Sequence, residues 1–562
     1  MKTALCPINP TIGDLEGNAR LIRDAVERSR AADVDLCVLP ELCVCGYPPR
    51  DLLLLDGFVE ACEETLATLA GSLPRGMAVI VGLPLRGQTD RLRNSLVVLR
   101  DGKRIARYDK RLLPTYDVFD EDRYFESADE PVIFEHKGVR IGLSVCEDLW
   151  KGKDAGFNSR YARRADPICE LGDAGAQLII NPSASPFVLG KHRTHAQQIA
   201  AHTRSTGVPI ASINQLGGND ELIFHGQARV TNPDGSSCAT RPFSEQDLIF
   251  DFTSGDVLCR SAGGDDEGSM AMLFDALVLG VRDYVRKTGF SETLLGLSGG
   301  IDSALTAVIA AAALGPEKVL GISMPGKYSS EHSKTDAIDL AQRLSMRIET
   351  APIAEPFEGL RNVSDSVFDS LGERRLGETL PDLTEENLQS RVRGTLMMTI
   401  SNRTGALLLT TGNKSEVAVG YSTLYGDMNG GLAVLSDVPK TKVYELSRWI
   451  NANHSRCGFA HAPIPESTIT KPPSAELAPE QKDSDSLPDY DTLDAIIEGY
   501  VEQRRSADQI EASTGAPPET IARVLRMIDR NEYKRKQLAT GLKVTHVAFG
   551  VGRRMPIAQR WR

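Results

Sequence analysis

Short apolar runs alternate with amphipathic stretches through residues 1 to about 250. The runs are rich in β-branched residues and end at turn residues, which is typical of buried strands. They cover residues 35–40, 77–84, 95–100, 139–146, 176–183 and 208–214. Between several of them, residues 18–32 and 58–73 repeat apolar positions at helical spacing. This alternation predicts an α/β domain or four layers of sheets and helices.

A second alternating pattern begins after residues 251–269, whose Gly, Ser and Asp content predicts a last strand and then a linker. Helices are predicted at 270–289, 301–314, 331–345 and in the tail at 491–540, and strands at 293–298, 318–325 and 406–411. Strands that alternate with helices predict a parallel sheet with crossover helices. We place the domains at 1–260 and 261–562.

Proline, serine and acidic residues crowd the segment 463–491. This composition predicts a mobile surface loop. Two interpretations stay open for it: a plain linker, or a lid that closes over a reactive intermediate and excludes water.

Composition narrows the class of protein. The chain has 562 residues, 41% hydrophobic and 25% charged, which is ordinary for globular domains. Its net charge of −12 and sequence pI near 5.4 speak against a broad nucleic-acid surface. No run approaches the roughly 20 apolar residues of a membrane span, and the first residues lack the pattern of a signal peptide. We expect a cytoplasmic protein without nucleic-acid or membrane partners.

Cysteines and histidines give no metal pattern in the sequence. The ten cysteines are scattered without CxxC pairing, and we expect reduced thiols. Cys43 and Cys45 are interpreted as packing residues. His192, His195 and His202 resemble a metal cluster, but no carboxylate stands at metal spacing in the sequence, so we favour an interpretation without metal.

The segment GLSGGIDS, residues 296–303, follows an apolar strand and opens a helix. Glycines let backbone N–H groups approach a pyrophosphate, and a helix N-terminus favours the anion. Asp302 is a candidate ligand for Mg²⁺. The segment differs from the Walker pattern, which ends in Gly-Lys-Ser/Thr. It resembles the PP-loop of ATP pyrophosphatases, which cleave ATP between the α- and β-phosphates and adenylylate a substrate.

Further segments narrow this resemblance. ENLQSRVRG (386–394), LLTTGNKSEVAVGYSTLYGD (408–427), SDVPKTKVYELSRWI (436–450) and NEYKRKQ (531–537) are similar to NAD synthetases. The resemblance implies a doubly wound parallel-sheet PP-loop domain of the adenine nucleotide alpha hydrolase-like type. It assigns ATP to Gly296, Leu297, Ser298, Gly299, Gly300, Ile301, Asp302, Ser303 and Thr411, deamido-NAD to Asn387, Glu416 and Lys534, and Mg²⁺ to Asp302 and Glu416.

Three residues of the N-terminal half form a candidate amidase site. Glu41 follows one predicted strand, Lys110 precedes a loop, and Cys146 ends another strand. Strand ends are where open α/β sheets build their sites. A cysteine nucleophile needs a base and an electropositive neighbour. Glu41 can take the thiol proton, and Lys110 can stabilise a tetrahedral oxyanion.

This combination resembles the nitrilase superfamily, whose Glu–Lys–Cys triad hydrolyses amides through a thioester. NPSASPF (181–187) and LGGNDELIFHGQA (216–228) match that family as well. The resemblance implies an αββα sandwich. In glutamine-dependent NAD synthetases this domain is the glutaminase, and the glutamine-binding residues fall on Tyr116, Ser185 and Lys191. Glu121 matches a second glutamate of several nitrilases, although its acidic cluster is equally typical of a surface.

The two resemblances together imply a glutamine-hydrolysing NAD synthetase, a ligase. It releases ammonia from glutamine and uses it to amidate adenylylated deamido-NAD, giving NAD, AMP, pyrophosphate and glutamate. An internal ammonia tunnel and a homo-oligomer are expected. Two alternatives stay open: an amidotransferase with another acceptor, such as a nucleobase or tRNA base, and a binding protein with a degenerate site.

Overall fold

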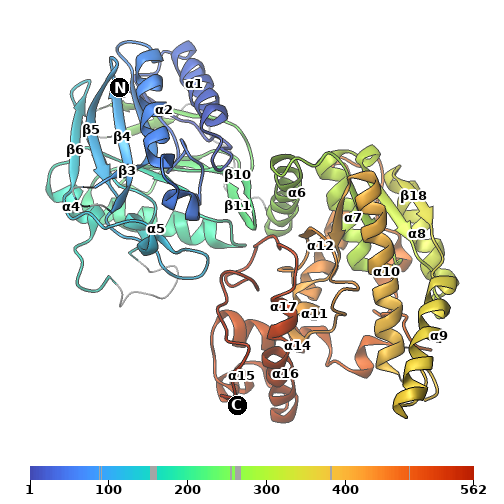
Figure 1. Ribbon diagram of the computed structural model, residues 1–562. Coiled ribbons are helices and arrows are strands. Elements are labelled where there is room, and N and C mark those ends of the chain that lie inside the picture. The colour runs from blue at the N-terminus through green and yellow to red at the C-terminus, as the bar shows by residue number, and fades with distance from the viewer. Residues whose placement is uncertain are drawn as a thin grey trace. The chain divides into compact units, whose positions relative to one another are not determined.

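The computed structural model describes residues 1–87, 89, 91–151, 161–253, 256–259, 268–379, 382–479 and 481–561 (Figure 1). The chain divides into two compact units, Met1–Ala276 and Leu277–Arg562. The predicted linker and the predicted boundary at 260/261 fall largely on residues 260–267, which lie outside the described residues. Helix α6 (Ser269–Lys287) begins just after them and carries the chain from the first unit into the second.

Two sheets form the centre of the N-terminal unit. One has seven strands in the order β15-β14-β1-β2-β3-β4-β5, and the other has six in the order β13-β12-β9-β8-β7-β6. The strands are β1 (Lys2–Leu5), β2 (Leu36–Val38), β3 (Ala78–Arg86), β4 (Leu92–Arg100), β5 (Lys103–Asp109), β6 (Val132–His136), β7 (Val139–Leu143), β8 (Leu178–Ser183), β9 (Ile210–Asn214), β12 (Ala228–Thr231), β13 (Ser237–Ala239), β14 (Leu248–Thr253) and β15 (Asp256–Cys259), with β10 (Leu216–Asn219) and β11 (Leu222–His225) in a separate hairpin. All six strands predicted from apolar runs are present.

The alternation of side chains along these strands explains the layers. On β2, Leu36 and Val38 pack between the two sheets, whereas Cys37 packs toward α1 (Leu15–Ala31) and α2 (Phe58–Ser72). On β8, Ile180 packs between the sheets and Ile179 packs toward α4 (Pro167–Asp173) and α5 (Lys191–Thr206). Successive side chains point to opposite faces of a strand, so both faces of each sheet are buried. The predicted αββα sandwich is confirmed.

A parallel sheet of five strands forms the centre of the C-terminal unit. Its order is β18-β17-β16-β19-β20, with bounds β16 (Thr293–Gly296), β17 (Val319–Ser323), β18 (Arg347–Thr350), β19 (Leu407–Thr410) and β20 (Leu432–Ala433). The chain runs outward from β16 to β18 and then returns to β19 on the other side of β16. Where the strand order reverses in this way, the carboxyl ends of two neighbouring strands open a crevice for ligands. The predicted doubly wound parallel sheet is confirmed, and its switch point lies between β16 and β19.

Helices surround this sheet and extend beyond it. They are α7 (Ile301–Leu314), α8 (Glu331–Leu344), α9 (Ala354–Leu371), α10 (Leu383–Thr404), α11 (Lys414–Val419), α12 (Lys440–Ala452), α13 (Glu466–Thr470), α14 (Tyr490–Ile497), α15 (Ala507–Thr514), α16 (Pro518–Arg530) and α17 (Glu532–Arg535). Met397 of α10 packs on Leu294 and Leu408 of the sheet. The predicted helical tail corresponds to α14–α17, and the apolar faces of α14, α15 and α16 form a cluster of their own with α11. None of the described helices is long and apolar enough to cross a membrane.

Two predictions about local structure need correction. The segment 463–491 is not loop throughout, because it contains α13 and a short 3₁₀-helix at Asp483–Asp485. The expectation that every cysteine is reduced is wrong for Cys238, which is disulfide-bonded. Sequence spacing gives no sign of such a bond, because it requires two sulfurs to meet in space. Cys43 and Cys45 are free, fully buried thiols in the apolar cluster beneath α1 and α2, where burial raises the pKa of Cys43 to about 12.

Two candidate active sites

The three predicted catalytic residues of the N-terminal unit come together at strand ends. Glu41 follows β2, Lys110 follows β5 and Cys146 follows β7, so both sheets contribute. Their exposed fractions are only 0, 1 and 3%. Lys110 Nζ donates to Glu41 Oε1 at 2.7 Å. Both charges also act on the thiol of Cys146, with opposite effects on its pKa.

Glu41 is held in one orientation by further donors. Asn94 Nδ2 donates to Glu41 Oε1 at 2.7 Å, and the backbone N–H of Ala184 donates to Oε2 at 2.8 Å. Because both carboxylate oxygens are engaged and the side chain is fully buried, it has little freedom to rotate. A fixed carboxylate of this kind is suited to accept a proton from a neighbouring nucleophile.

Glu121 is the second carboxylate of this site. The structure buries it to 4% exposure, so it does not belong to an acidic surface. Lys110 Nζ donates to Glu121 Oε1 at 2.8 Å, and the Tyr47 hydroxyl donates to the same oxygen at 2.9 Å. Burial raises the pKa of Glu121 to about 7, and the charge of Glu41 adds to the rise while Lys110 opposes it. One lysine is therefore shared between two buried carboxylates.

The Cys146 thiol is protonated in this resting arrangement. Burial raises its pKa well above the usual value, Glu41 raises it further, and Lys110 opposes both. The backbone of Cys146 has φ 44° and ψ −100°, a sparsely populated conformation for a residue with a side chain. Its N–H donates to Pro182 O at 3.0 Å, which anchors it to the end of β8. A protonated thiol has to pass its proton to a base before it can act as a nucleophile, and the carboxylate of Glu41 is close enough to influence the pKa of Cys146.

The predicted glutamine-binding residues lie at different places around this cluster. The Tyr116 hydroxyl donates to Glu147 Oε2 at 2.8 Å, next to Cys146 in the chain. Ser185 follows the residue whose N–H binds Glu41, and its own N–H donates to an asparagine side chain at 2.8 Å. Lys191 begins α5, and its ammonium lies 5.3 Å from the centroid of the Trp150 ring, at the end of α3 (Glu147–Trp150).

The predicted PP-loop joins β16 to α7 at the switch point of the second sheet. Gly299 has φ +79°, and a Cβ there would lie 2.3 Å from Ser333 O, so only glycine fits. Two serines fix the shape of the loop. The N–H of Gly300 donates to Ser298 Oγ at 3.1 Å, and the Ser303 hydroxyl donates to Gly300 O at 2.9 Å.

Asp302 and Glu416 approach each other from two segments of this unit. Asp302 lies in the first turn of α7 and Glu416 in the first turn of α11. Lys440 Nζ donates to Asp302 Oδ2 at 2.6 Å and to Glu416 Oε1 at 3.0 Å. Asn413 Nδ2 donates to the other oxygen of Asp302 at 2.8 Å. Burial raises the pKa of Glu416 to about 7, with Lys440 opposing the rise and Asp302 adding to it.

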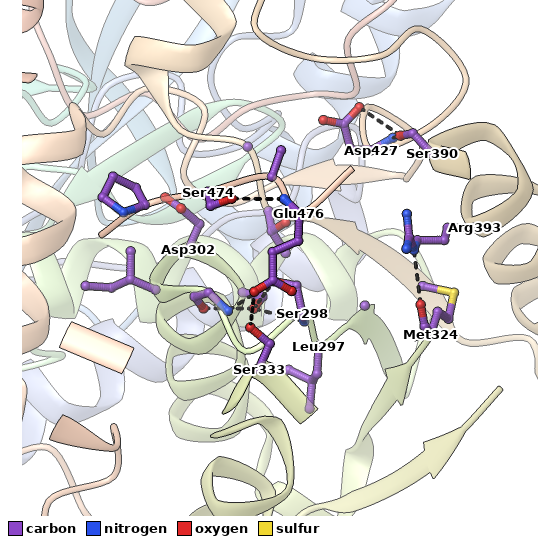
Figure 2. A pocket seen from close by; sticks show the side chains of 18 of the residues that line it. Leu297, Ser298, Asp302, Met324, Ser333, Ser390, Arg393, Asp427, Ser474 and Glu476 are labelled. Carbon is purple, nitrogen blue, oxygen red and sulfur yellow. Dashed lines mark hydrogen bonds between the residues drawn. The ribbon is translucent and has the colours of Figure 1, made fainter. Parts of the chain in front are cut away.

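A cavity of about 330 Å³ opens above these residues. The predicted ATP residues line this cavity: all of 296–303 except Gly299, and Thr411. Glu416 and Lys440 line it as well. Residues 471–477, part of the predicted loop or lid, form another side of the cavity. Figure 2 shows Glu476 reaching across to Ser333, whose hydroxyl donates to its carboxylate at 2.7 Å. Ser330 Oγ donates to the same carboxylate at 2.8 Å.

Two of the predicted deamido-NAD residues lie outside this lining. Asn387 Oδ1 accepts a hydrogen bond from the Thr423 hydroxyl at 2.8 Å. Lys534 Nζ donates to the carbonyl oxygens of Gly420 and Ser422, at 2.8 and 2.7 Å. Both therefore hold the segment that follows α11, whereas Glu416, the third predicted residue, faces the cavity.

Lys440 is the residue of this site that sequence reasoning missed. It is 2% exposed and begins α12. A cation at a helix N-terminus is unfavourable with respect to the helix dipole, and this local conflict was a usable sign of a functional role. The two carboxylates that face it outweigh its burial and raise its pKa.

Comparisons with known proteins identify the family to which both units belong. A family model described as carbon-nitrogen hydrolase matches residues 2–252, and one described as NAD synthase matches residues 273–538. A glutamine-dependent NAD(+) synthetase of Synechocystis sp. is 46% identical and covers 99% of this chain and 98% of its own. One of Rhodobacter capsulatus is 42% identical over 100% and 99%. The structure of the glutamine-dependent NAD+ synthetase from Acinetobacter baumannii in complex with ADP is 35% identical, with a TM-score of 0.76 and coverage of 100% and 99%. The chain belongs to the family of glutamine-dependent NAD(+) synthetases, which are ligases.

Proposed function

We propose that Cys146, Glu41 and Lys110 release ammonia from glutamine and that the cavity at the PP-loop uses it to amidate adenylylated deamido-NAD. The observation that carries the first half is the geometry of Glu41, which is fixed by three hydrogen bonds beside a protonated, buried thiol. The second half rests on the PP-loop at the switch point of the parallel sheet, facing a cavity of about 330 Å³.

In the glutaminase step, the Cys146 sulfur attacks the side-chain amide carbon of glutamine while its proton moves to Glu41. Lys110 stabilises the negative charge on the carbonyl oxygen of the tetrahedral intermediate. Collapse breaks the carbon–nitrogen bond, and the proton held by Glu41 leaves with the nitrogen as ammonia. Water then attacks the thioester, Glu41 accepts its proton, and glutamate is released with the thiol restored.

In the synthetase step, a carboxylate oxygen of deamido-NAD attacks the α-phosphorus of ATP and pyrophosphate leaves. Ammonia then attacks the carboxyl carbon of the adenylate, AMP leaves, and the amide of NAD is formed. The N–H groups in the first turn of α7 bind phosphate oxygens. Ser298 adds a hydroxyl donor, Ser303 holds the shape of the loop through its bond to Gly300 O, and Lys440 neutralises charge that develops on the phosphates.

Asp302 and Glu416 fit a magnesium ion. Both are hard oxygen donors on the wall of the cavity, and in this structure they share one ammonium group. When bound, Mg²⁺ would supply positive charge against the phosphates of ATP. Asp302 and Glu416 would hold it, and Lys440 would then be released toward the phosphates.

Transfer of ammonia sets a further requirement. Ammonia is a nucleophile only when neutral, and water would protonate it, so a desolvated route is expected. The internal tunnel stays a prediction. Dilution of ¹⁵N-glutamine nitrogen by added unlabelled ammonium tests it: retention of label in NAD supports the tunnel, and full dilution contradicts it. Assembly into a homo-oligomer also stays a prediction, which light scattering checks.

The decisive experiment separates the two nitrogen sources. We expect Cys146→Ala to abolish NAD formation from glutamine and to leave formation from ammonium salt near the wild-type rate. Cys62→Ala, at another buried free thiol of the same unit, is the matched control and is expected to keep both. Loss of both routes in Cys146→Ala would contradict the division of labour.

A companion experiment tests the acceptor. AMP release is measured with deamido-NAD and with other carboxylate or base acceptors, in the presence of ammonium. Among the acceptors we expect only deamido-NAD to give AMP release. Asp302→Asn is expected to abolish this release, whereas Asp339→Asn, at a half-exposed position on α8, keeps it. Equal turnover of an unrelated acceptor would reject deamido-NAD as the substrate.

A further inference from the structure

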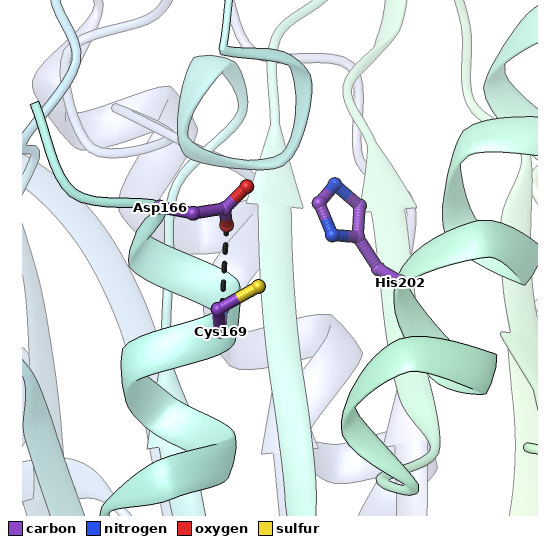
Figure 3. A group of neighbouring side chains, drawn as sticks. All are labelled: Asp166, Cys169 and His202. Carbon is purple, nitrogen blue, oxygen red and sulfur yellow. Dashed lines mark hydrogen bonds between the residues drawn. The ribbon is translucent and has the colours of Figure 1, made fainter.

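Three metal-binding side chains meet on the helix-covered side of the smaller sheet, apart from both candidate active sites. Asp166 is the N-cap of α4, Cys169 lies in the first turn of α4, and His202 lies on α5. One ligand atom of each lies within 4.8 Å of the other two (Figure 3). Among the described residues, His192 and His195 take no part in such a group. The carboxylate that His202 lacks in the sequence is therefore supplied in space by another helix.

The hydrogen bond of His202 fixes which ring nitrogen is available. Its Nε2 lies 2.8 Å from the carbonyl oxygen of Leu149. A carbonyl oxygen only accepts, so Nε2 carries the proton and Nδ1 keeps its lone pair. Figure 3 shows the other ring nitrogen of His202 turned toward the side of Asp166 and Cys169. A histidine held by a backbone carbonyl through one nitrogen is the usual arrangement of a metal ligand.

The ligands come from a rigid part of the fold. Ile168 and Leu171 of α4 pack with Ile199 of α5 and with Leu149 and Trp150 of α3. Asp166 Oδ1 accepts the N–H groups of Ile168 and Cys169, at 3.0 and 3.3 Å, which sets the direction of its carboxylate. The backbone that carries the three ligands is therefore packed before any ion binds, so only side-chain adjustments are needed to bring the ligand atoms onto an ion.

We propose that Asp166, Cys169 and His202 form a binding site for a zinc-class divalent cation, with water as a fourth ligand. A thiolate with an imidazole and a carboxylate selects Zn²⁺ over Mg²⁺ or Ca²⁺. With metal–ligand distances of about 2.0–2.3 Å, tetrahedral ligands lie roughly 3.3–3.8 Å apart, so ligand atoms now within 4.8 Å of one another close by at most about 1.5 Å on binding.

The three ligands differ in burial. His202 is buried, while Asp166 and Cys169 are half-buried. A thiol binds a cation as thiolate, so the proposed binding releases the thiol proton.

The site joins three helices around the proposed nucleophile. Metal binding would cross-link α4 to α5, and the His202–Leu149 hydrogen bond extends the link to α3, which directly follows Cys146. The expected consequence is a higher thermal midpoint of the N-terminal unit, because a ligand that binds only the folded state stabilises it.

The test is a titration of the chelator-treated full chain with Co²⁺, which reports a thiolate ligand by a charge-transfer absorption. We expect one band per chain, present also in Cys146→Ala and lost in Cys169→Ser and in His202→Gln, whose affinities fall by about 100-fold or more. Two matched controls keep the band. One is Cys457→Ser in the C-terminal unit, and the other is Asp173→Asn on the exposed face of α4. A band that survives Cys169→Ser, or one that disappears only with Cys146→Ala, would overturn the proposal.

A second measurement needs no substitution and covers the case in which a variant fails to fold. The rate of Cys169 alkylation is followed by peptide mass spectrometry with and without Zn²⁺. We expect Zn²⁺ to slow alkylation at Cys169 at least about tenfold and Mg²⁺ to have no effect. An alkylation rate that saturating Zn²⁺ leaves unchanged would refute the site independently of any variant.

Discussion

In the N-terminal site Lys110 lies between Glu41 and Glu121, and in the C-terminal site Lys440 lies between Asp302 and Glu416. The nitrogen–oxygen distances are 2.7 and 2.8 Å in the first and 2.6 and 3.0 Å in the second. In each site burial raises the pKa of one glutamate to about 7. The surroundings differ: the carboxylates of the first site are 0 and 5% exposed, and those of the second are 17 and 19% exposed.

The difference indicates which cation can be exchanged. A hydrated cation cannot reach two fully buried carboxylates, so none can displace the lysine between them. Removal of one partner of such a buried pair is strongly destabilising, because the other charge is left unpaired. Lys110 is therefore a permanent part of its site. Lys440 shares its carboxylates at the wall of a cavity, where the proposed Mg²⁺ would replace it. The same charge pattern thus suits an oxyanion donor in one unit and a displaceable counter-ion in the other.

The largest effect is expected from Lys110→Met, which keeps the side-chain volume and removes the charge. Loss of the oxyanion donor lowers glutamine-dependent kcat by about 10³-fold. Two buried carboxylates then face each other, which costs about 3–5 kcal/mol of stability. Ammonia-dependent synthesis is retained. Steady-state kinetics with both nitrogen sources check this, with the half-exposed Lys137→Met as the control, and glutamine turnover above a tenth of wild type would contradict it.

Lys440→Met is expected to have the next largest effect and to break the symmetry between the sites. Synthesis from glutamine and from ammonia falls together by about 10²-fold, because a charge that faces the phosphates is lost. The thermal midpoint of Lys440→Met falls below that of the wild type, and Mg²⁺ raises it again in part, because the ion takes the place of the ammonium group. The thermal midpoint of Lys110→Met is expected not to change with Mg²⁺. Lys442→Met on the same helix is the control, and equal responses of both variants to Mg²⁺ would reject the comparison.

The sequence was sufficient where chemistry coincides with a strand end. Glu41 follows and Cys146 closes a recognisable apolar run, whereas Lys110 follows the polar strand β5, which was not predicted. The structure brings the three residues together. Two strands were harder to predict: the edge strand β18 is mostly exposed and has no apolar run, and the interior strand β1 has only four residues. Contacts across the fold left no local trace, and the cluster of Asp166, Cys169 and His202 is the clearest case.

Assignments that rest on resemblance alone depend on contacts that the sequence does not contain. Asn387 and Lys534 were predicted as substrate ligands, and the structure shows them holding the segment after α11. Their roles toward deamido-NAD stay predictions. Lys440 had a local sign, a cation at the start of a helix, but its partners Asp302 and Glu416 lie far away in the sequence. Such a sign acquires meaning only when the fold supplies the partners.

A smaller effect concerns pH, and here too the two sites are expected to differ. The raised pKa of Glu121, about 7 against a usual 4.5, means that the folded protein keeps a proton that the unfolded chain releases. Stability from this group is fully present below about pH 4.5 and declines as pH rises to about 7, by at most about 3 kcal/mol. Glu121→Gln is expected to flatten this decline.

Glu416→Gln is also expected to flatten the decline in stability with rising pH. In the wild type, bound Mg²⁺ is expected to flatten the part of the decline that comes from Glu416, because the cation favours the charged carboxylate. Thermal midpoints between about pH 5 and 7 check this, with and without Mg²⁺. The exposed Glu130→Gln is the control. A pH dependence that Glu121→Gln leaves unchanged would contradict the assignment in the N-terminal site.

The smallest effect is expected from Glu476→Ala, which loosens one wall of the open site. Its carboxylate accepts hydrogen bonds from the hydroxyls of Ser330 and Ser333 at the start of α8, and it thereby holds residues 471–477 against the cavity. Because Glu476 is only half-buried, the loss of stability stays within about 1 kcal/mol. The KM for ATP rises several-fold while glutamine hydrolysis is unchanged. The exposed Glu466→Ala on α13 is the control. A lower KM for ATP would contradict this prediction. It would mean that the Glu476 carboxylate competes with the phosphates of ATP and that residues 471–477 obstruct the cavity.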